Sequence, residues 1–144
     1  SLLGVCLISG FLMFVAGEVY LLNNQILSEH ERSFRRNSHP INTSAVAFKR
    51  LVTHPPGNGS HCFYFVGEVR TFSGDRKHVA GFYAGKQVQL EFFEQGQLQS
   101  FPYVWLSQLP DWVNSQANSS ENYYLIYSLN SKIDDYTSFD WRCN

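Results

Sequence analysis

SLLGVCLISGFLMFVAG, residues 1–17, contains no charged side chain, and the first charge of the chain is Glu18. A second apolar run, VYLL at 19–22, follows that glutamate. A helix over 1–22 would be about 33 Å long, which is enough to cross the hydrocarbon core of a bilayer. We therefore expect a retained membrane helix, although a cleaved signal peptide and a buried core helix stay open as alternatives. The side chains expected to insert are Leu2, Leu3, Val5, Leu7, Ile8, Phe11, Leu12, Phe14 and Val15.

Residues 18–37 (EVYLLNNQILSEHERSFRRN) contain no Gly and no Pro and continue the helical pattern. One stripe of this helix consists of Val19, Leu22, Ile26, His30 and Phe34. Arginines gather at its C-terminal end, where the helix dipole favours cations, and Ser38-His39-Pro40 ends it. The sequence predicts one continuous helix of about 35 residues, roughly 55 Å long, apolar first and amphipathic second. Two helices broken near Gly17 are the alternative.

The remainder of the chain, residues 38–144, is predicted to form a β-rich head. Residues 41–52 favour a short helix, with a strand as the alternative. Period-2 alternation and turn signals predict strands over 62–72, 79–83, 87–94, 98–106 and 122–129. Regular turn spacing indicates an antiparallel meander that packs on the amphipathic half of the helix. The expected fold class is α+β, with a membrane and stalk helix over 1–37 and an extracytoplasmic antiparallel β-sheet head over 38–144.

Composition and motifs exclude several function classes. Charged residues are 16% of the chain, aromatic residues are also 16%, and the net charge is −1, which argues against disorder and against nucleic-acid binding. The five histidines have no metal-site spacing, and no nucleophile elbow, phosphate loop or dinucleotide fingerprint occurs. We therefore expect no enzyme, no metal, no cofactor and no small-molecule substrate.

Cys62 and Cys143 bracket the head, whereas Cys6 lies in the apolar helix. A Cys62–Cys143 disulfide would close a loop of about 80 residues and stabilise the fold by about 4.5 kcal/mol; two free buried thiols are the alternative. A disulfide implies an extracytoplasmic head. The arginines at 32, 35 and 36 would instead keep that side in the cytoplasm. The conflict disappears if a short basic leader once preceded Ser1.

This layout resembles that of type IV pilin-like proteins. Their basic leader is removed just before an apolar stretch, the mature helix is apolar first and amphipathic second, and a disulfide near the C-terminus often ties a small β-rich head. The matching parts here are 1–17, 19–37, the aromatic head from about residue 41, and Cys143 as the penultimate residue. The resemblance implies a single-pass inner-membrane protein with an extracytoplasmic head that can enter a surface filament.

One position departs from that family. Major pilins carry a glutamate at the fifth mature position, where this chain has Val5. The resemblance therefore implies a minor, tip-type pilin or pseudopilin that takes part in assembly of a type IV pilus or related secretion pseudopilus. Its partners would be other pilin-like subunits, reached through the head and through helix packing at Val19, Leu22 and Ile26. The alternative function is a membrane-anchored domain that binds a protein or glycan through aromatic residues, with Tyr103 and Trp112 as its surface.

Overall fold

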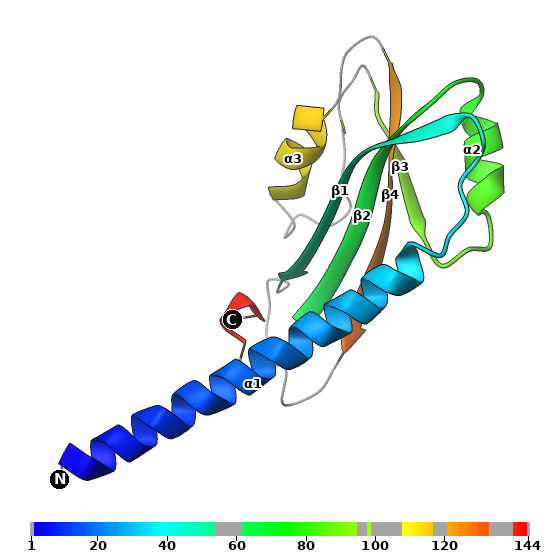
Figure 1. Cartoon of the computed structure of the whole chain (residues 1–144). Coiled ribbons are helices and arrows are strands. Elements are labelled where there is room, and N and C mark those ends of the chain that lie inside the picture. Colours follow the sequence, from blue (N-terminus) through cyan, green and yellow to red (C-terminus); the bar gives the residue numbers. More distant parts are fainter. Residues whose placement is uncertain are drawn as a thin grey trace.

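A long helix that packs against one antiparallel sheet dominates the architecture (Figure 1). The computed structural model describes residues 2–53, 62–94, 98, 108–116, 121–132 and 140–143, with the backbone alone at 2–5, 108 and 132. The elements are α1 (Leu2–Phe34), β1 (Thr43–Thr53), β2 (Cys62–Phe72), α2 (Arg76–Tyr83), β3 (Gln89–Phe92), α3 (Gln108–Gln116), β4 (Asn122–Lys132) and the 3₁₀ helix η3 (Trp141–Cys143). The expected α+β class, a long helix on a small antiparallel sheet, is confirmed.

Helix α1 is continuous over 33 residues and passes through Gly17 without a break. Its last turn is closed by the Asn37 side-chain amide, which donates to the carbonyl of Phe34 at 2.8 Å. Pro40 follows and cannot extend the helix, because it has no backbone N–H. By length and composition, α1 can cross a membrane.

The segment 41–52 was expected to favour a short helix, with a strand as the alternative; it is strand β1, so the helix was wrong and the alternative is confirmed. Residues 43–53 pair antiparallel with β2, interrupted by one irregularity between Ala45 and Ala47. Thr43 does not cap a helix, because its hydroxyl donates to the Pro40 carbonyl at 2.8 Å. Strand propensity depends on neighbours, and the long partner strand β2 outweighs a weak local helix signal.

The strand expected over 79–83 was also wrong, since these residues belong to helix α2. Asp75 is its N-cap, and Asp75 Oδ1 accepts from the Lys77 N–H at 2.9 Å. Val79 and Tyr83 are four residues apart and both are buried, as expected for one face of a helix. The N-cap aspartate after Ser73-Gly74 was the available signal for a helix start.

The sheet order is β1-β2-β4-β3, with every neighbouring pair antiparallel. The strands over 62–72 and 122–129 are confirmed, and the predicted strand 87–94 is confirmed over Gln89–Phe92. The meander is wrong, because the last strand, β4, lies between β2 and β3. Most of the strand expected over 98–106 lies outside the described residues.

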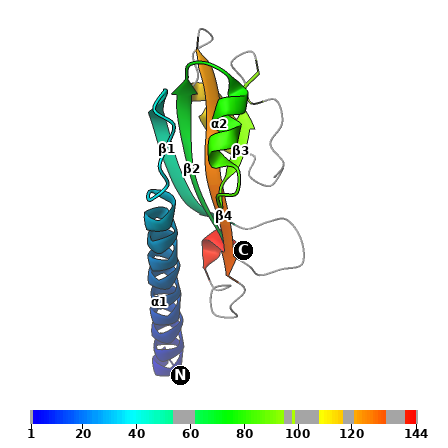
Figure 2. The ribbon, with the colours of Figure 1, turned by 90° about the vertical axis from the view of Figure 1, so that its right-hand side faces the viewer.

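Both faces of the sheet are buried, rather than the single face that packing on α1 alone would require. On the face that meets α1 and α2, the sheet contributes Tyr64, Val66, Phe72, Tyr124 and Ile126. On the opposite face, where α3 packs, it contributes Phe65, Val69, Tyr123, Leu125 and Tyr127. Figure 2 shows α1 and β1 on the same side of the molecule and α2 in front of the strands. The central strands are mostly apolar on both faces for this reason, with the Glu68–Arg70 pair on β2 as an exception.

Candidate functional site

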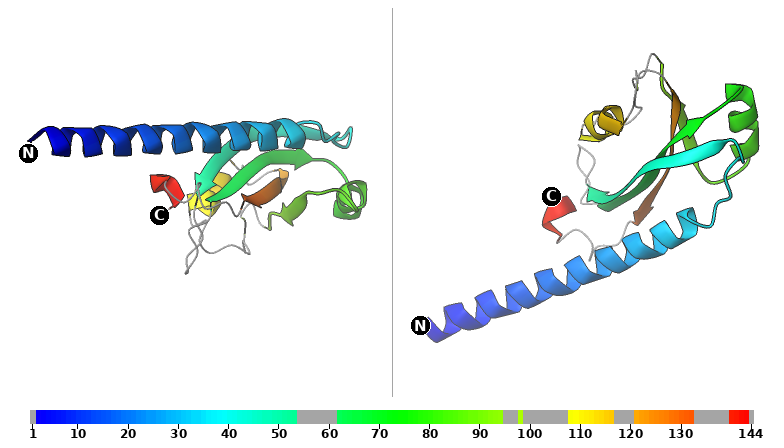
Figure 3. Two further views of the ribbon diagram at one scale, coloured as in Figure 1. Left: turned by 90° about the horizontal axis from the view of Figure 1, so that it is seen from below. Right: turned by 45° about the horizontal axis from the view of Figure 1, so that its top comes forward.

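The first half of α1 exposes its apolar side chains. Figure 3 shows this part of the helix extending beyond the head. The exposed fractions are 68% at Leu7, 64% at Ile8, 67% at Phe11, 61% at Leu12, 77% at Met13 and 65% at Phe14. Val15 is half-buried, while Leu2, Leu3 and Val5 lie on helical backbone whose side chains are not described. An exposed apolar surface of this extent marks a membrane or protein contact.

The second half of α1 packs on the head through most of the predicted stripe: Val19, Ile26 and Phe34 are buried, and Leu22 is the member that is exposed. Val19 and Ile26 are buried within the molecule, so they are not free to pack against helices of neighbouring subunits. Leu22 is 42% exposed and remains available for such a contact. Asn23, which has no exposed surface, lies on the buried face where Leu22 was expected. Apolar periodicity does not identify a buried asparagine, and the sequence prediction missed it.

Asn23 is the centre of a polar cluster that joins α1 to the C-terminal segment. Its Oδ1 accepts from the Tyr64 hydroxyl at 2.7 Å, and its Nδ2 donates to Asp140 Oδ2 at 2.9 Å. The same Nδ2 lies 3.4 Å from Cys62 Sγ. Because each of these contacts joins residues far apart in sequence, the amide fixes the rotation of α1 against the head.

The predicted Cys62–Cys143 disulfide is confirmed, with a Cα–Cα distance of 5.1 Å and a sequence separation of 81. Both cysteines are fully buried. Cys6 is a free, exposed thiol in the apolar half of α1. The bridge links the start of β2 to η3 and so holds the C-terminal segment against the sheet.

Arg142 completes the contacts that hold the C-terminal segment to α1 and β2; we call Asn23, Asp140, Arg142 and the Cys62–Cys143 bridge the clamp. Its Nη2 donates to Asp140 Oδ2 at 2.6 Å, and its Nη1 donates to Asn24 Oδ1 at 2.9 Å. Its Cζ lies 4.1 Å from the centroid of the Tyr20 ring, in range for a cation–π contact. Burial acts to raise the pKa of the Asp140 carboxyl, but hydrogen bonds from Arg142 and Asn23 outweigh it and hold the pKa below its ordinary value. Asp140 is therefore an anion that the clamp requires.

A second buried polar group lies on β2, between α1 and α2. Glu68 and Arg70 form an ion pair, and each residue is 8% exposed. Arg70 also donates through Nε to the hydroxyl of Thr43 at 3.2 Å and through Nη2 to its carbonyl at 3.3 Å. Glu68 and Arg70 are two residues apart on one strand, so both side chains point to the same face of the sheet. The bonds from Arg70 to Thr43 tie the start of β1 to the centre of the sheet.

The linker between α1 and β1, residues 35–42, contacts α2 through His39. Its Nδ1 lies 2.7 Å from the Tyr83 hydroxyl, which lies 3.1 Å from the Tyr124 hydroxyl. Burial, followed by the charge of Arg70, lowers the pKa of His39. Burial, followed by the hydrogen bond with Tyr124, raises the pKa of Tyr83. The neutral forms that result suit a structural hydrogen-bond chain.

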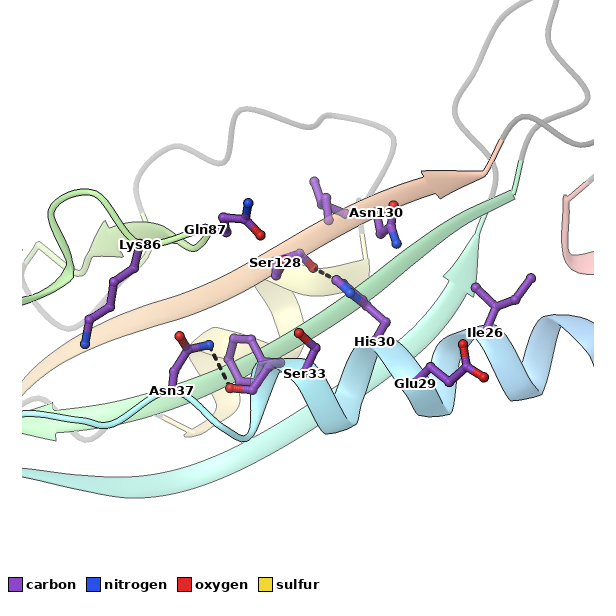
Figure 4. A pocket seen from close by; sticks show the side chains of 11 residues that line it. Ile26, Glu29, His30, Ser33, Asn37, Lys86, Gln87, Ser128 and Asn130 are labelled. Atoms are coloured by element: carbon purple, nitrogen blue, oxygen red, sulfur yellow. Dashed lines mark hydrogen bonds between the residues drawn. The ribbon is translucent and has the colours of Figure 1, made fainter.

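A groove of about 740 Å³ runs between α1 and β4 (Figure 4). It is lined by Ile26, Glu29, His30, Ser33, Phe34, Asn37, Lys86, Gln87, Ser128, Leu129 and Asn130. His30 Nε2 donates to the Ser128 carbonyl at 3.2 Å, which joins the helix to the strand. The histidine thus bonds to backbone and not to a serine hydroxyl. The arrangement secures helix packing and does not form a nucleophile with its base.

Of the two aromatic residues predicted as a partner surface, the structure describes only one. Trp112 on α3 is half-buried and packs against the core beneath that helix. Lys49 Nζ lies 5.3 Å from its ring centroid. Tyr103 lies outside the described residues. The ring of Trp112 therefore contributes to the core, with only part of its surface open to a partner.

Metal-ligating side chains do not gather in the described part of the chain: no group of three or more His, Cys, Asp or Glu there is close enough to hold an ion. No family model matches the chain, and no curated protein or solved structure matches it.

Proposed function

We propose that the chain is a structural subunit: a membrane-anchored minor pilin-like protein that takes part in assembling a type IV pilus or a related secretion pseudopilus. The observation that carries this proposal is the change of surroundings along α1. Leu12 is 61% exposed, whereas Leu27, further along the same helix, is 6% exposed. A subunit that is stored in a membrane and later packed in a filament needs such a helix.

The exposed half of α1 supports both stages of this function. In the inner membrane, its apolar side chains lie in lipid, and the clamp holds the head outside the bilayer against the second half of the helix. In a filament, the same side chains pack against those of neighbouring subunits and so remain out of water. Transfer between the two environments exchanges one apolar contact for another and exposes little apolar surface.

The polar groups between α1 and the head support a rigid subunit. Arg50 Nη1 on β1 lies 2.7 Å from Glu31 Oε2 on α1, and Glu31 also pairs with Arg35. The Arg50–Glu31 pair, together with the contacts of Asn23 and Arg142, attaches the second half of α1 to the head at several points. A rigid joint lets contacts between heads set the arrangement of the helices, which an initiating subunit requires.

The test is deletion of the gene in its source organism, followed by complementation. The wild-type gene is expected to restore surface filaments or pseudopilus-dependent secretion, and the protein is expected in the inner membrane and in sheared filaments. Leu12→Lys is expected to fail, because a lysine at mid-membrane depth costs about 3 kcal/mol. Leu12→Phe, which remains apolar, is the matched control and is expected to complement.

Two results would contradict the proposal. One is full restoration of filaments by the lysine variant. The other is deletion that leaves both filaments and secretion unchanged while the protein stays in the membrane. The second result would leave membrane anchoring intact and remove only the pilin-like role.

A further inference from the structure

The head presents exposed aromatic side chains at the point where α1 leaves it, beside the mostly buried Arg142. We call Tyr20, Trp141 and Arg142 the collar. Trp141 is 76% exposed and Tyr20 is 40% exposed. Figure 1 places η3, which carries Trp141 and Arg142, beside the middle of α1 and on the part of the described head that lies nearest the N-terminus. An exposed tryptophan in this position needs an explanation that the core does not provide.

The depth of the collar follows from helix geometry. Among the 18 residues immediately before Tyr20, only Glu18 is charged, and as a helix they rise about 27 Å, close to the roughly 30 Å of a bilayer's hydrocarbon core. Tyr20 therefore reaches the membrane interface when the residues before it fill that core. Glu18, the first charge, is exposed at the same level. Tryptophan and tyrosine are enriched at this depth, where an apolar ring and a polar tip both find partners.

The clamp holds the collar in a fixed position. Arg142 is bonded to Asp140 and Asn24 while its guanidinium lies against the Tyr20 ring. Cys143 is tied by its disulfide to Cys62. Trp141 lies between Asp140 and Arg142 in the sequence, and thus belongs to a fixed segment that Arg142 holds against Tyr20 of α1. Preorganised side chains lose little conformational entropy when they bind.

We propose that the collar is a membrane-contact surface that seats the head on the phospholipid headgroup layer and sets its height above the bilayer. The occupant is lipid because the collar lies where the apolar half of α1 ends, at interfacial depth. This inference rests on the proposed anchoring of α1 in a membrane. It adds a contact between head and lipid that anchoring alone does not require.

Fluorescence quenching in vesicles tests the collar. The full chain is reconstituted in phosphatidylethanolamine and phosphatidylglycerol vesicles whose lipids carry bromine either near the headgroup or near the bilayer centre. We expect shallow bromine to quench wild-type tryptophan emission, and Trp141→Phe to lose that quenching. Trp112→Phe is the matched control, because Trp112 packs on the opposite face of the sheet from α1; it is expected to keep the quenching.

Each alternative outcome overturns the collar. If Trp141→Phe is quenched like the wild type by shallow bromine, Trp141 does not contact lipid. If central bromine quenches the Trp141 emission more strongly than shallow bromine, the residue is inserted and not interfacial. Flotation of the same samples distinguishes failure of membrane anchoring from failure of the collar contact. Protein that fails to float with vesicles overturns both anchoring and collar, whereas protein that floats without the Trp141-dependent quenching overturns the collar alone.

Discussion

Leu12 and Leu27 are the same residue type on one unbroken helix, yet their surroundings are opposite. Leu12 lies in the apolar half of α1 (residues 2–17) and is 61% exposed; Leu27 lies in the packed half (residues 18–34) and is 6% exposed. The packed half is the more polar of the two, with Asn23 among its fully buried residues. The head therefore determines which residues of α1 are buried, and it leaves the more apolar half of the helix exposed.

The largest effect should come from releasing the C-terminal segment that holds the packed half. Replacing both Cys62 and Cys143 by serine is expected to lower the free energy of unfolding by about 4.5 kcal/mol, because the loop they close is long. Urea unfolding in detergent, followed by circular dichroism, measures the loss. Cys6→Ser, at the exposed free thiol, is the control and should leave the midpoint unchanged. An equal midpoint with and without reducing agent would contradict the expectation.

The comparison of the two leucines can be tested directly. Leu27→Ala is expected to lower the free energy of unfolding by about 3 kcal/mol, because it leaves a cavity between α1 and the sheet. Leu12→Ala, the matched change in the apolar half, should alter it by less than about 0.5 kcal/mol. The same urea titration serves for both variants. Equal effects from the two substitutions would show that the halves are not distinguished by the head.

The clamp should give a smaller effect with a clear pH dependence. Asp140→Asn removes the carboxylate that pairs with Arg142, at a cost of about 2 kcal/mol at neutral pH. The pKa of Asp140 is lowered in the folded protein, so its contribution is complete above the unfolded value of about 3.9 and disappears as the pH falls through the folded value. The difference in unfolding free energy between wild type and variant should therefore shrink in acid. A difference that stays constant between neutral pH and pH of about 3 would argue against this ion pair.

The smallest effect is expected at the linker that leaves the packed half. The pKa of His39 is lowered by burial and by the charges of Arg70 and Lys86, with Glu68 opposing them. Folding thus favours neutral His39, and its contribution is present above about pH 6.5 and lost as the pH falls through the lowered value. His39→Gln should reduce the pH dependence of stability in that range. Unfolding midpoints measured from mildly alkaline to mildly acidic pH give the slope, and an unchanged slope would contradict the assignment.

The local sequence pattern was sufficient to predict those elements whose own residues show a clear helix or strand periodicity. The charge-free run over 1–17 and the uninterrupted stretch over 18–37 predicted a continuous α1. Alternation predicted β2 and β4, and the positions of Cys62 and Cys143 suggested the disulfide. It was not sufficient for β1, whose state depends on pairing with β2, or for α2, where the Asp75 cap was overlooked.

The sequence by itself determined that residues 1–17 form an apolar stretch without a charge and that a helix continues from it into a β-rich head. Only the tertiary structure decided that β4 lies between β2 and β3, that Asn23 replaces Leu22 on the buried face, and that Arg142 lies over Tyr20. The physical reason is range. Helix and strand periodicities depend on residues a few positions apart, whereas the Asn23–Asp140 hydrogen bond joins residues 117 positions apart. Such a contact exists only once the chain has folded.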